Sequence, residues 1–399
     1  MSNRKKSRSR QRKRRFLVLN KDGYYDYSLL AVVILLTCFG LVMLYSTSAY
    51  ISEVRYDDDM FYFGKQAAIS AGGILMMVAI SMFDYHVLKN FTAFLYVAAA
   101  ILMLLVLSPL GVTVNGAKRW LKLGIQFQPS EIAKIAAIVC ISYLIVQMGK
   151  QIQTLKATIV LLGIGGALGA IAYLATDNLS TGIIICGITW ILVAMASPYT
   201  KYFVMITAVM FVLLLILVQV MKYSIDTADS SSFRIQRVLV WLHPEQNSDA
   251  GGYQVMQALY AIGSGGFFGK GLGNSVQKLG SVPEAQNDMI FSIVCEELGI
   301  FGGAIILALF AYLLYRLVFI SQNAPDLFGS LMVAGIMIHI ALQVILNICV
   351  VTNVIPTTGV TLPFVSYGGT SILFLMAEMG IALSVSHQIK IQDSSEASQ

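Results

Sequence analysis

The sequence has 399 residues, of which 57% are hydrophobic and only 12% are charged. Its mean hydropathy of +0.74 is far above that of a soluble globular chain. This composition excludes an ordinary soluble enzyme, and a large part of the chain is expected to face lipid.

The formal charge of +6 comes from one short segment. Nine of the 27 Lys and Arg lie between Arg4 and Arg15, where no acid occurs, and the rest of the chain carries 18 basic and 21 acidic residues. Such an arm can bind nucleic acid or anionic lipid. Ahead of a hydrophobic segment, its ordinary role is to hold the N-terminus in the cytoplasm. We therefore expect membrane lipids, and no nucleic acid, as partners of this arm.

The apolar segments predict ten transmembrane helices, because a bilayer core takes about 20 apolar residues per helix. The first segment lacks a small-residue cleavage site and is expected to be a retained anchor. The five cysteines fall inside apolar segments without a CxxC motif, which indicates neither a disulfide framework nor a zinc site. The predicted spans are 27–50, 63–83, 92–110, 130–148, 157–175, 180–197, 201–222, 289–319, 328–352 and 367–387.

The predicted fold is therefore an all-α integral membrane protein with a basic cytoplasmic arm (1–26), a polytopic membrane domain (27–387) and a cytoplasmic tail (388–399). A large extracytoplasmic loop, at about 223–287, separates the seventh and eighth helices. Lysines in the connections after the even-numbered helices fit a cytoplasmic location, and three consecutive aspartates fit an outer first loop. These residues are Lys89, Lys150, Lys156 and Lys201, and Asp57, Asp58 and Asp59.

The first outer segment of interest runs from Asn115 to Lys134. It places Lys118, Arg119 and Lys122 outside, against the usual distribution of cations, which indicates an anionic partner. Arg and Lys suit phosphate oxygens, and Trp120 suits the headgroup level of a membrane, so together they would suit a lipid pyrophosphate. The alternative is that the cations contact lipid phosphates at random and that the tryptophan is an interfacial belt residue.

The same segment ends with Pro129 at a predicted helix start. Glu131 and Lys134 follow one turn apart and can pair on one helix face. Because ionisable groups are costly at membrane depth, the pair is either an internal clasp or part of a site wall.

The long outer loop contains a predicted amphipathic helix at Gly252 to Ile262, in which Gln254 and Gln257 share one face. A glycine-rich run follows at 263–273. Its spacing departs from a nucleotide-binding P-loop and no strand precedes it, so we interpret it as flexible backbone or a plain turn.

Asp288 lies where the long loop enters the eighth helix. A carboxylate there can face the outer side as a base, or it can be an ordinary helix cap. For Glu296 and Glu297 we expect hydrogen bonds between helices. The last outer connection, 356–371, combines prolines and glycines with hydroxyl residues, and either lines a cavity or forms a rigid turn.

Four motifs make the resemblance specific. NGAKRW with QPSEIAK, GYQVMQALYAIGSGGFFGKGLGNS, PEAQNDMIFSIVCEELG and PTTGVTLPFVSYGGTS resemble those of the SEDS family (shape, elongation, division and sporulation) in the same order along the bundle. Within the family, the last two motifs and the basic arm are most similar to the division members. One departure is TDNLST at 176–181, where many members have PDLGT, so no role is carried over to Asp177.

The resemblance implies a peptidoglycan glycosyltransferase that polymerises lipid II on the outer face of the cytoplasmic membrane, in septal synthesis. Asp288 matches the aspartate regarded as catalytic in the family. We expect substrate contacts from further residues, most of them on the matched motifs. They are Lys118, Arg119, Trp120, Gln128, Ser130, Glu131, Lys134, Gln254, Gln257, Glu284, Ser366 and Tyr367.

The chemistry of lipid II agrees with a single carboxylate. Its undecaprenyl pyrophosphate is a leaving group that needs no general acid, whereas the acceptor GlcNAc 4-hydroxyl must lose a proton, which Asp288 can take. Lys118 and Arg119 would stabilise the pyrophosphate, and an α-linked donor giving a β-linked product implies inversion. A divalent cation, Mg²⁺ or Mn²⁺, is left open as a cofactor. The implied partners are lipid II, a class B penicillin-binding protein (a transpeptidase) and other division proteins.

Three alternatives stay open at this point. The chain can be an elongation or sporulation paralogue of the same family. A lipid II flippase would explain the same cations but should place polar groups through the middle of the membrane. A scaffold that only recruits division proteins would not need Asp288.

Overall fold

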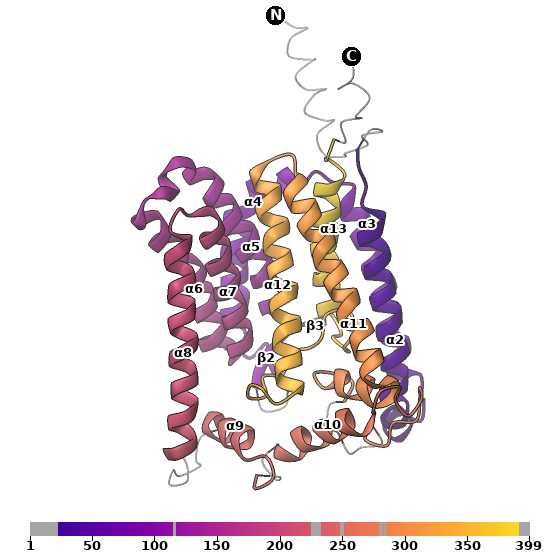
Figure 1. Ribbon diagram of the computed structural model, residues 1–399. Helices are drawn as coiled ribbons and strands as arrows, with labels where there is room; N and C mark the ends of the chain where they lie inside the picture. Colours follow the sequence, from indigo (N-terminus) through magenta and orange to yellow (C-terminus); the bar gives the residue numbers. More distant parts are fainter. Residues whose placement is uncertain are drawn as a thin grey trace, which may run out of the picture.

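The structure is a computed structural model that describes residues 23–114, 117–224, 233–247, 251–278, 282 and 285–390. Figure 1 shows a bundle of long helices with a small sheet and two short helices across one end. The helices are α2 (Tyr27–Tyr56), α3 (Phe61–Ser81), α4 (Leu88–Leu105), α5 (Pro129–Met148), α6 (Leu155–Thr176), α7 (Leu179–Ala196), α8 (Thr200–Ser224), α9 (Phe233–Leu242), α10 (Gly252–Ser264), α11 (Ile290–Asn323), α12 (Leu327–Val351) and α13 (Ser371–Ser386), with short 3-10 turns at Tyr85–Val87 and Gly149–Gln153.

Nine helices in the described part of the chain are long and apolar enough to cross a membrane, and α13 is a shorter apolar helix. The predicted multi-pass α-helical membrane fold is therefore confirmed. The last predicted span, 367–387, is reduced to Ser371–Ser386, because 367–370 stay in the preceding connection.

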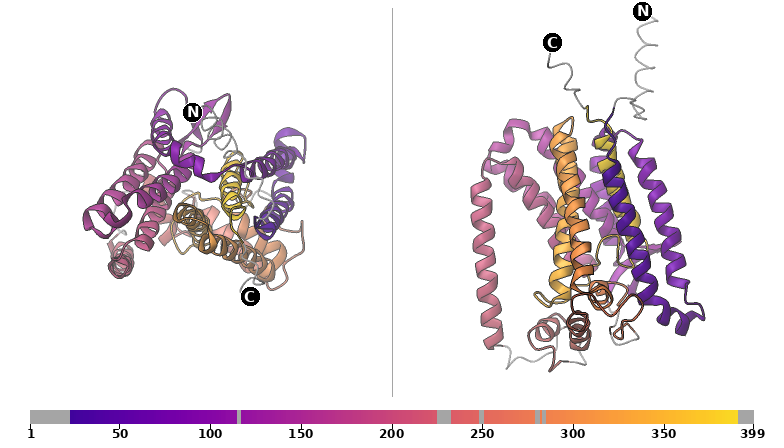
Figure 2. Two further views of the ribbon diagram at one scale, coloured as in Figure 1. Left: turned by 90° about the horizontal axis from the view of Figure 1, so that it is seen from above. Right: turned by 45° about the vertical axis from the view of Figure 1, so that its right-hand side comes forward.

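Both ends of the described chain lie at the same end of the bundle, which we call the termini end (Figures 1 and 2). Gly23 pairs with Lys390 in an isolated bridge, and the Tyr24 amide donates to the Ile389 carbonyl at 3.0 Å. The opposite end, which carries the sheet, α9 and α10, is called the far end. The predicted arm and tail lie mainly in 1–22 and 391–399, outside the described residues, so those boundaries stay predictions.

Side-chain caps fix where several helices begin. Asp26 accepts from the Leu29 amide at 2.9 Å at the start of α2, and Asp326 accepts from the Gly329 amide at 2.9 Å at the start of α12. Asn178 caps α7 in the same way. Pro129 occupies the first turn of α5, where its missing amide hydrogen costs nothing.

A small antiparallel sheet at the far end was not predicted. Its strands are β1 (Gly111–Val114), β2 (Ala117–Leu123) and β3 (Ile125–Phe127), in the order β1-β2-β3. The third predicted span, 92–110, was too long at this end, since α4 stops at Leu105 before the strands begin. Gly124, with φ +80°, makes the tight turn between β2 and β3.

The eighth predicted span is broken near its start. Gly299 lies inside α11 with φ +71° and ψ −172°, so the backbone is not helical there. A side chain at this position would meet the Phe267 carbonyl oxygen 2.2 Å from its Cβ, because the glycine-rich loop packs against the break. The predicted span at 289–319 is therefore confirmed as α11, with a break at Gly299 that was not predicted. The break separates the first helical turns, next to Asp288, from the long span.

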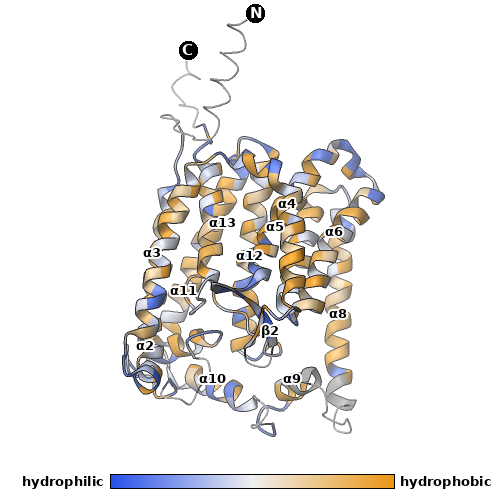
Figure 3. Ribbon diagram, turned by 180° about the vertical axis from the view of Figure 1, so that it is seen from behind, coloured by the Kyte–Doolittle hydropathy of each residue, from blue (hydrophilic) through white to orange (hydrophobic). Residues whose placement is uncertain are grey.

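The short helices lie across the far end of the bundle, as Figure 3 shows with their mixed polar and apolar residues. The predicted amphipathic helix is confirmed as α10, with Val255 buried. Helix α9 was not predicted. Among the long helices α12 and α5 are the most buried, whereas α8 is only 6% buried over its most apolar window and stands at the edge of the bundle.

Candidate active site

Polar side chains gather at the far end around the connection between α12 and α13, residues 352–370. We call this group the far-end polar cluster. Four side chains from three helices donate to backbone carbonyls of this connection. Arg237 of α9 donates to Thr357 at 3.3 Å, Ser180 of α7 to Thr358 at 3.1 Å, Asn347 of α12 to Val360 at 2.7 Å, and Gln343 of α12 to Thr361 at 3.0 Å. This connection, predicted either to line a cavity or to form a rigid turn, is therefore held by side chains rather than by a sheet or helix.

Asp288 lies beside this connection, directly before α11. The buried Asn347 amide donates to the Asp288 carbonyl at 2.8 Å as well as to Val360, so it fixes the aspartate backbone to the connection. A second hydrogen bond joins the two segments, since the Tyr367 amide donates to the Gln286 carbonyl at 2.9 Å. The half-buried Asp288 side chain is close enough to Arg237 to favour the charged guanidinium.

Two guanidinium groups approach each other at this site. Burial, together with the charge of Arg237, lowers the pKa of Arg119. Burial also lowers the pKa of Arg237, and Asp288 opposes that effect. Two neighbouring like charges in a half-buried setting are unfavourable unless an anion lies between or beside them.

A bulge in the sheet directs Arg119 toward this cluster. Val112 pairs with Trp120 and Thr113 with Lys118, so Arg119 is the extra residue of β2. Its guanidinium donates to the Asp177 carbonyl at 2.9 Å, and one of its terminal nitrogens lies 4.0 Å from the Cβ that a residue at Gly359 would carry. The Arg119 Nε is buried and has no hydrogen-bond partner among the described residues, which leaves a donor available to a ligand.

The other predicted residues of the first motif take different positions. Lys118 donates to the Leu107 and Ser108 carbonyls at 3.0 and 2.8 Å, so it holds the turn that follows α4. Trp120 is partly exposed on β2. The Gln128 amide donates to the Ser130 hydroxyl at 2.9 Å, and Ser130 is buried at the start of α5.

The predicted pairing of Glu131 and Lys134 is confirmed. The Lys134 ammonium lies 3.0 Å from a Glu131 carboxylate oxygen, and both residues are buried. Lys134 also donates to Gln343 at 3.4 Å, and Gln343 in turn donates to the central connection. The pair thus joins α5 and α12 below the site and supports its wall.

The remaining predicted residues lie around the same end. Gln254 and Gln257 are half-buried on α10. The Ser366 hydroxyl accepts from the Leu362 amide at 2.8 Å and shapes the connection, whereas Tyr367 packs on Tyr62 with ring centroids 5.2 Å apart. Burial raises the pKa of Tyr367. Glu284 lies outside the described residues.

The buried glutamates after Asp288 hold the glycine-rich loop. Glu297 accepts from Ser46 of α2 at 2.7 Å and lies 2.8 Å from the Lys278 ammonium. Glu296 lies 2.7 Å from Lys270 and accepts from Ser275. The predicted contact between helices is confirmed for Glu297, and the loop is fixed beside the start of α11.

The described residues contain no group of three or more His, Cys, Asp or Glu that could hold a metal ion. Asp288 and Asp177 are the acids of this cluster, and one or two carboxylates with substrate phosphates can suffice for Mg²⁺. The cation therefore stays an open prediction.

Comparison with known proteins shows which family has this architecture. The profile of the cell cycle protein family FtsW/RodA/SpoVE matches residues 26–391, which is nearly the whole chain. The chain belongs to the SEDS family.

Curated SEDS relatives align over almost their full length. Stage V sporulation protein E of Bacillus subtilis is 37% identical over 368 residues, which are 90% of this chain and 96% of the relative. A probable peptidoglycan glycosyltransferase FtsW of a Geobacter species is 33% identical over 369 residues, 92% of this chain and 98% of the relative.

Solved structures share the SEDS fold. A chain from a study of polymerization and crosslinking by a peptidoglycan synthase complex has a TM-score of 0.73 and 26% identity, and the match covers 92% of this chain and 99% of that chain. The rod shape determining protein RodA of Thermus thermophilus has a TM-score of 0.64 at 24% identity, covering 92% and 98%.

Sequence reasoning missed two residues of this SEDS site. Arg237 lies in the long loop, and the signal that pointed to Arg119, a cation on the outer side, applied to it equally. Asn347, fully buried in a predicted span, could have been noted as a polar residue at membrane depth.

Proposed function

We propose that this protein is a peptidoglycan glycosyltransferase that polymerises lipid II at the extracytoplasmic face of the cell membrane. The far end would face outward and the termini end would face the cytoplasm. The basic arm supports this orientation, because an excess of Lys and Arg marks the cytoplasmic side.

One observation carries the proposal: Asp288 lies near the half-buried Arg237, which in turn lies near Arg119, in a chain that belongs to the SEDS family. Asp288 is positioned by Asn347 through the aspartate backbone, so its carboxylate is held near Arg237. A base next to an anion-binding pair is what transfer from a sugar diphosphate requires.

In the proposed reaction, Asp288 accepts the proton of the acceptor GlcNAc 4-hydroxyl as its oxygen attacks C1 of the donor muramic acid. The bond from C1 to the pyrophosphate oxygen breaks, and its electron pair leaves with undecaprenyl pyrophosphate. Attack opposite to the α-linked leaving group inverts C1 and gives a β-linked strand. Arg119 and Arg237 stabilise the charge that develops on the diphosphate.

The Lys118 ammonium already donates to two backbone carbonyls. We therefore propose Arg237, and not Lys118, as the second cation that binds the diphosphate with Arg119. Substrate contacts remain proposed for the other predicted residues. These are Trp120, Gln128, Ser130, Glu131, Lys134, Gln254, Gln257, Glu284, Ser366 and Tyr367. Of these, Glu131 and Lys134 would act by supporting the site wall.

The solved peptidoglycan synthase complex supports a partner protein for this chain. We propose a class B penicillin-binding protein as the transpeptidase, with other division proteins in the same assembly. A septal role is proposed from the motif wording, and sporulation is the alternative raised by the Bacillus relative. Imaging the tagged protein at the septum, at the sidewall or in the forespore distinguishes the three roles.

Strand synthesis from lipid II by the purified protein with its partner tests the function. Asp288→Ala is expected to abolish polymer, whereas Glu245→Gln, which neutralises an exposed acid of the same loop, should leave it unchanged. A flippase or a scaffold would keep transport or recruitment without Asp288. Full polymer from Asp288→Ala would therefore reject the proposed base.

A further inference from the structure

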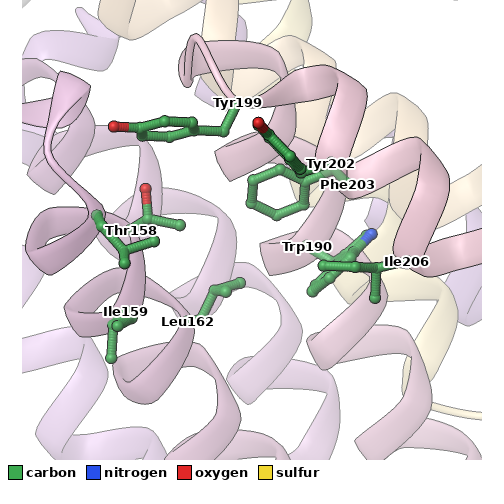
Figure 4. Close-up of a pocket in the computed structure, with 9 residues that line it drawn as sticks. Thr158, Ile159, Leu162, Trp190, Tyr199, Tyr202, Phe203 and Ile206 are labelled. Atoms are coloured by element: carbon green, nitrogen blue, oxygen red, sulfur yellow. The ribbon is translucent and has the colours of Figure 1, made fainter.

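A second site lies at the termini end, far from Asp288. Helices α6, α7 and α8 enclose a cavity of about 460 Å³. Figure 4 shows Leu162, Trp190, Phe203 and Ile206 lining it, with the hydroxyl-bearing side chains of Thr158, Tyr199 and Tyr202 around them. Its volume falls within the range of about 300–1,000 Å³ of pockets that hold small organic ligands.

Helix α8 is attached to α7 beside the cavity. Phe203 is buried against Trp190, with ring centroids 4.6 Å apart, and the Trp190 indole donates to the Thr207 hydroxyl at 3.0 Å. Beyond this contact α8 is largely exposed and leaves the bundle. The cavity lies beside this contact, between the starts of α6 and α8 and the end of α7.

The cavity is open toward the membrane. The lining residues Leu155, Ile159 and Tyr202 are 60–62% exposed, although they belong to helices of the apolar bundle. In a bilayer such a space must be filled by lipid, since apolar walls offer water too few hydrogen bonds.

Two exposed lysines are adjacent in sequence to residues that line the cavity. Lys156 follows the lining residue Leu155, and Lys201 precedes the lining residue Tyr202; both lysines are exposed. The sequence contains no Asp or Glu from 148 to 176 or from 178 to 224, so these helices offer the lysines no acid. Basic pockets between membrane helices are suited to anionic lipid headgroups.

We propose that this cavity binds one anionic glycerophospholipid from the leaflet at the termini end. An acyl chain fills the apolar space beside Trp190, and the phosphate lies between Lys156 and Lys201. The hydroxyls of Tyr199 and Tyr202 stand at headgroup level. Scattered lysines that merely follow the membrane orientation would show no selectivity for one lipid, so selectivity is the property to measure.

Trp190 provides the probe. The full chain is placed in phosphatidylcholine bilayers that contain a small fraction of phosphatidylglycerol, and either lipid carries brominated chains that quench tryptophan. The fluorescence quenching of Trp190 is obtained as the difference between the quenching of the wild type and that of Trp190→Phe. We expect phosphatidylglycerol to bind about thirtyfold more tightly than phosphatidylcholine, since each lysine near an anionic headgroup contributes about fivefold.

The double variant Lys156→Ala/Lys201→Ala should abolish this preference, whereas Lys65→Ala, at an exposed lysine of α3, should keep it. Ile206→Phe narrows the cavity and should weaken the binding of both lipids at the site. Val204→Phe, on α8 outside the lining, is its control. Equal quenching by the two lipids in the wild type would overturn the proposal. So would a preference that survives loss of both lysines in a variant that unfolds at the wild-type temperature.

Discussion

Oppositely charged pairs occur at both ends of the bundle, but two neighbouring guanidinium groups are found beside Asp288 at the far end. At the termini end, each described charge of the buried clusters has an opposite partner: Arg316 lies 2.7 Å from Asp26, Lys89 lies 3.0 Å from Asp326, and His86 lies between Asp326 and Asp84. At the far end, burial and the charge of Arg237 lower the pKa of Arg119, which Asp177 raises. Burial lowers the pKa of Arg237, which Asp288 raises.

We propose that this difference separates structural charges from functional ones. Balanced pairs hold the chain ends and helix starts together and need no ligand. A crowded cationic pair gains free energy when an anion arrives, so it stores binding energy for a substrate. Changes at the far end should therefore alter activity, and changes at the termini end should alter stability.

The largest effect is expected at the far end. Arg237→Gln removes one of the two positive charges proposed to stabilise the departing diphosphate. It should slow strand synthesis by about a hundredfold, which is the typical loss when one transition-state donor is removed. The rate of polymer formation from lipid II measures this. Lys122→Gln, at an exposed cation of β2, is the control, and an equal loss in both variants would mean that only the general field of the surface matters.

At the termini end, Asp26→Ala should lower the free energy of unfolding by about 3 kcal/mol, because it leaves the Arg316 guanidinium without its buried partner. It also removes the cap of α2. Denaturant unfolding in detergent measures the change, and Glu53→Ala, at an exposed acid of the same helix, should cost little. A folded Asp26→Ala protein of unchanged stability but no activity would contradict the division of roles.

A smaller effect on stability is expected when the pH is lowered. Burial opposes ionisation of Asp326, but hydrogen bonds from Tyr85, the Gly329 amide and Lys89 lower its pKa overall. A lowered folded pKa stabilises the fold above the ordinary aspartate value of about 3.9, and this contribution is lost as pH falls through the folded pKa. Unfolding temperatures should thus be flat from about pH 7 to 5 and fall below about pH 4. Asp326→Asn should show a shallower fall than the wild type, and an identical profile would exclude this contribution.

The sequence predicted the bundle well because membrane spans need only length and apolar composition. It predicted Asp288 and Arg119 because both lie in motifs whose residue types suit a sugar diphosphate. Helix α9 was missed because its ten residues lie inside a polar loop, although their apolar and polar side chains are segregated on two helix faces. The break at Gly299 depends on Phe267, 32 positions earlier, and such tertiary contacts leave no local pattern.

The function of Lys118 illustrates the same limit. A cation in an outer segment fits a phosphate site by type. The Lys118 ammonium nevertheless binds carbonyls of the turn that follows α4, because the β1–β2 pairing places it there. Arg119 differs from its neighbour by one position and reaches the site because of the bulge. Residue type identified the region, and backbone geometry assigned the roles.

The most direct test uses Asp288→Asn, which keeps the size of the side chain but cannot take a proton at catalytic pH. Binding of lipid II and synthesis of glycan strands are measured on the same purified complex. Wild-type binding with no strand formed is the predicted result, because the guanidinium pair remains while the base is lost. Strand synthesis at the wild-type rate would contradict the account.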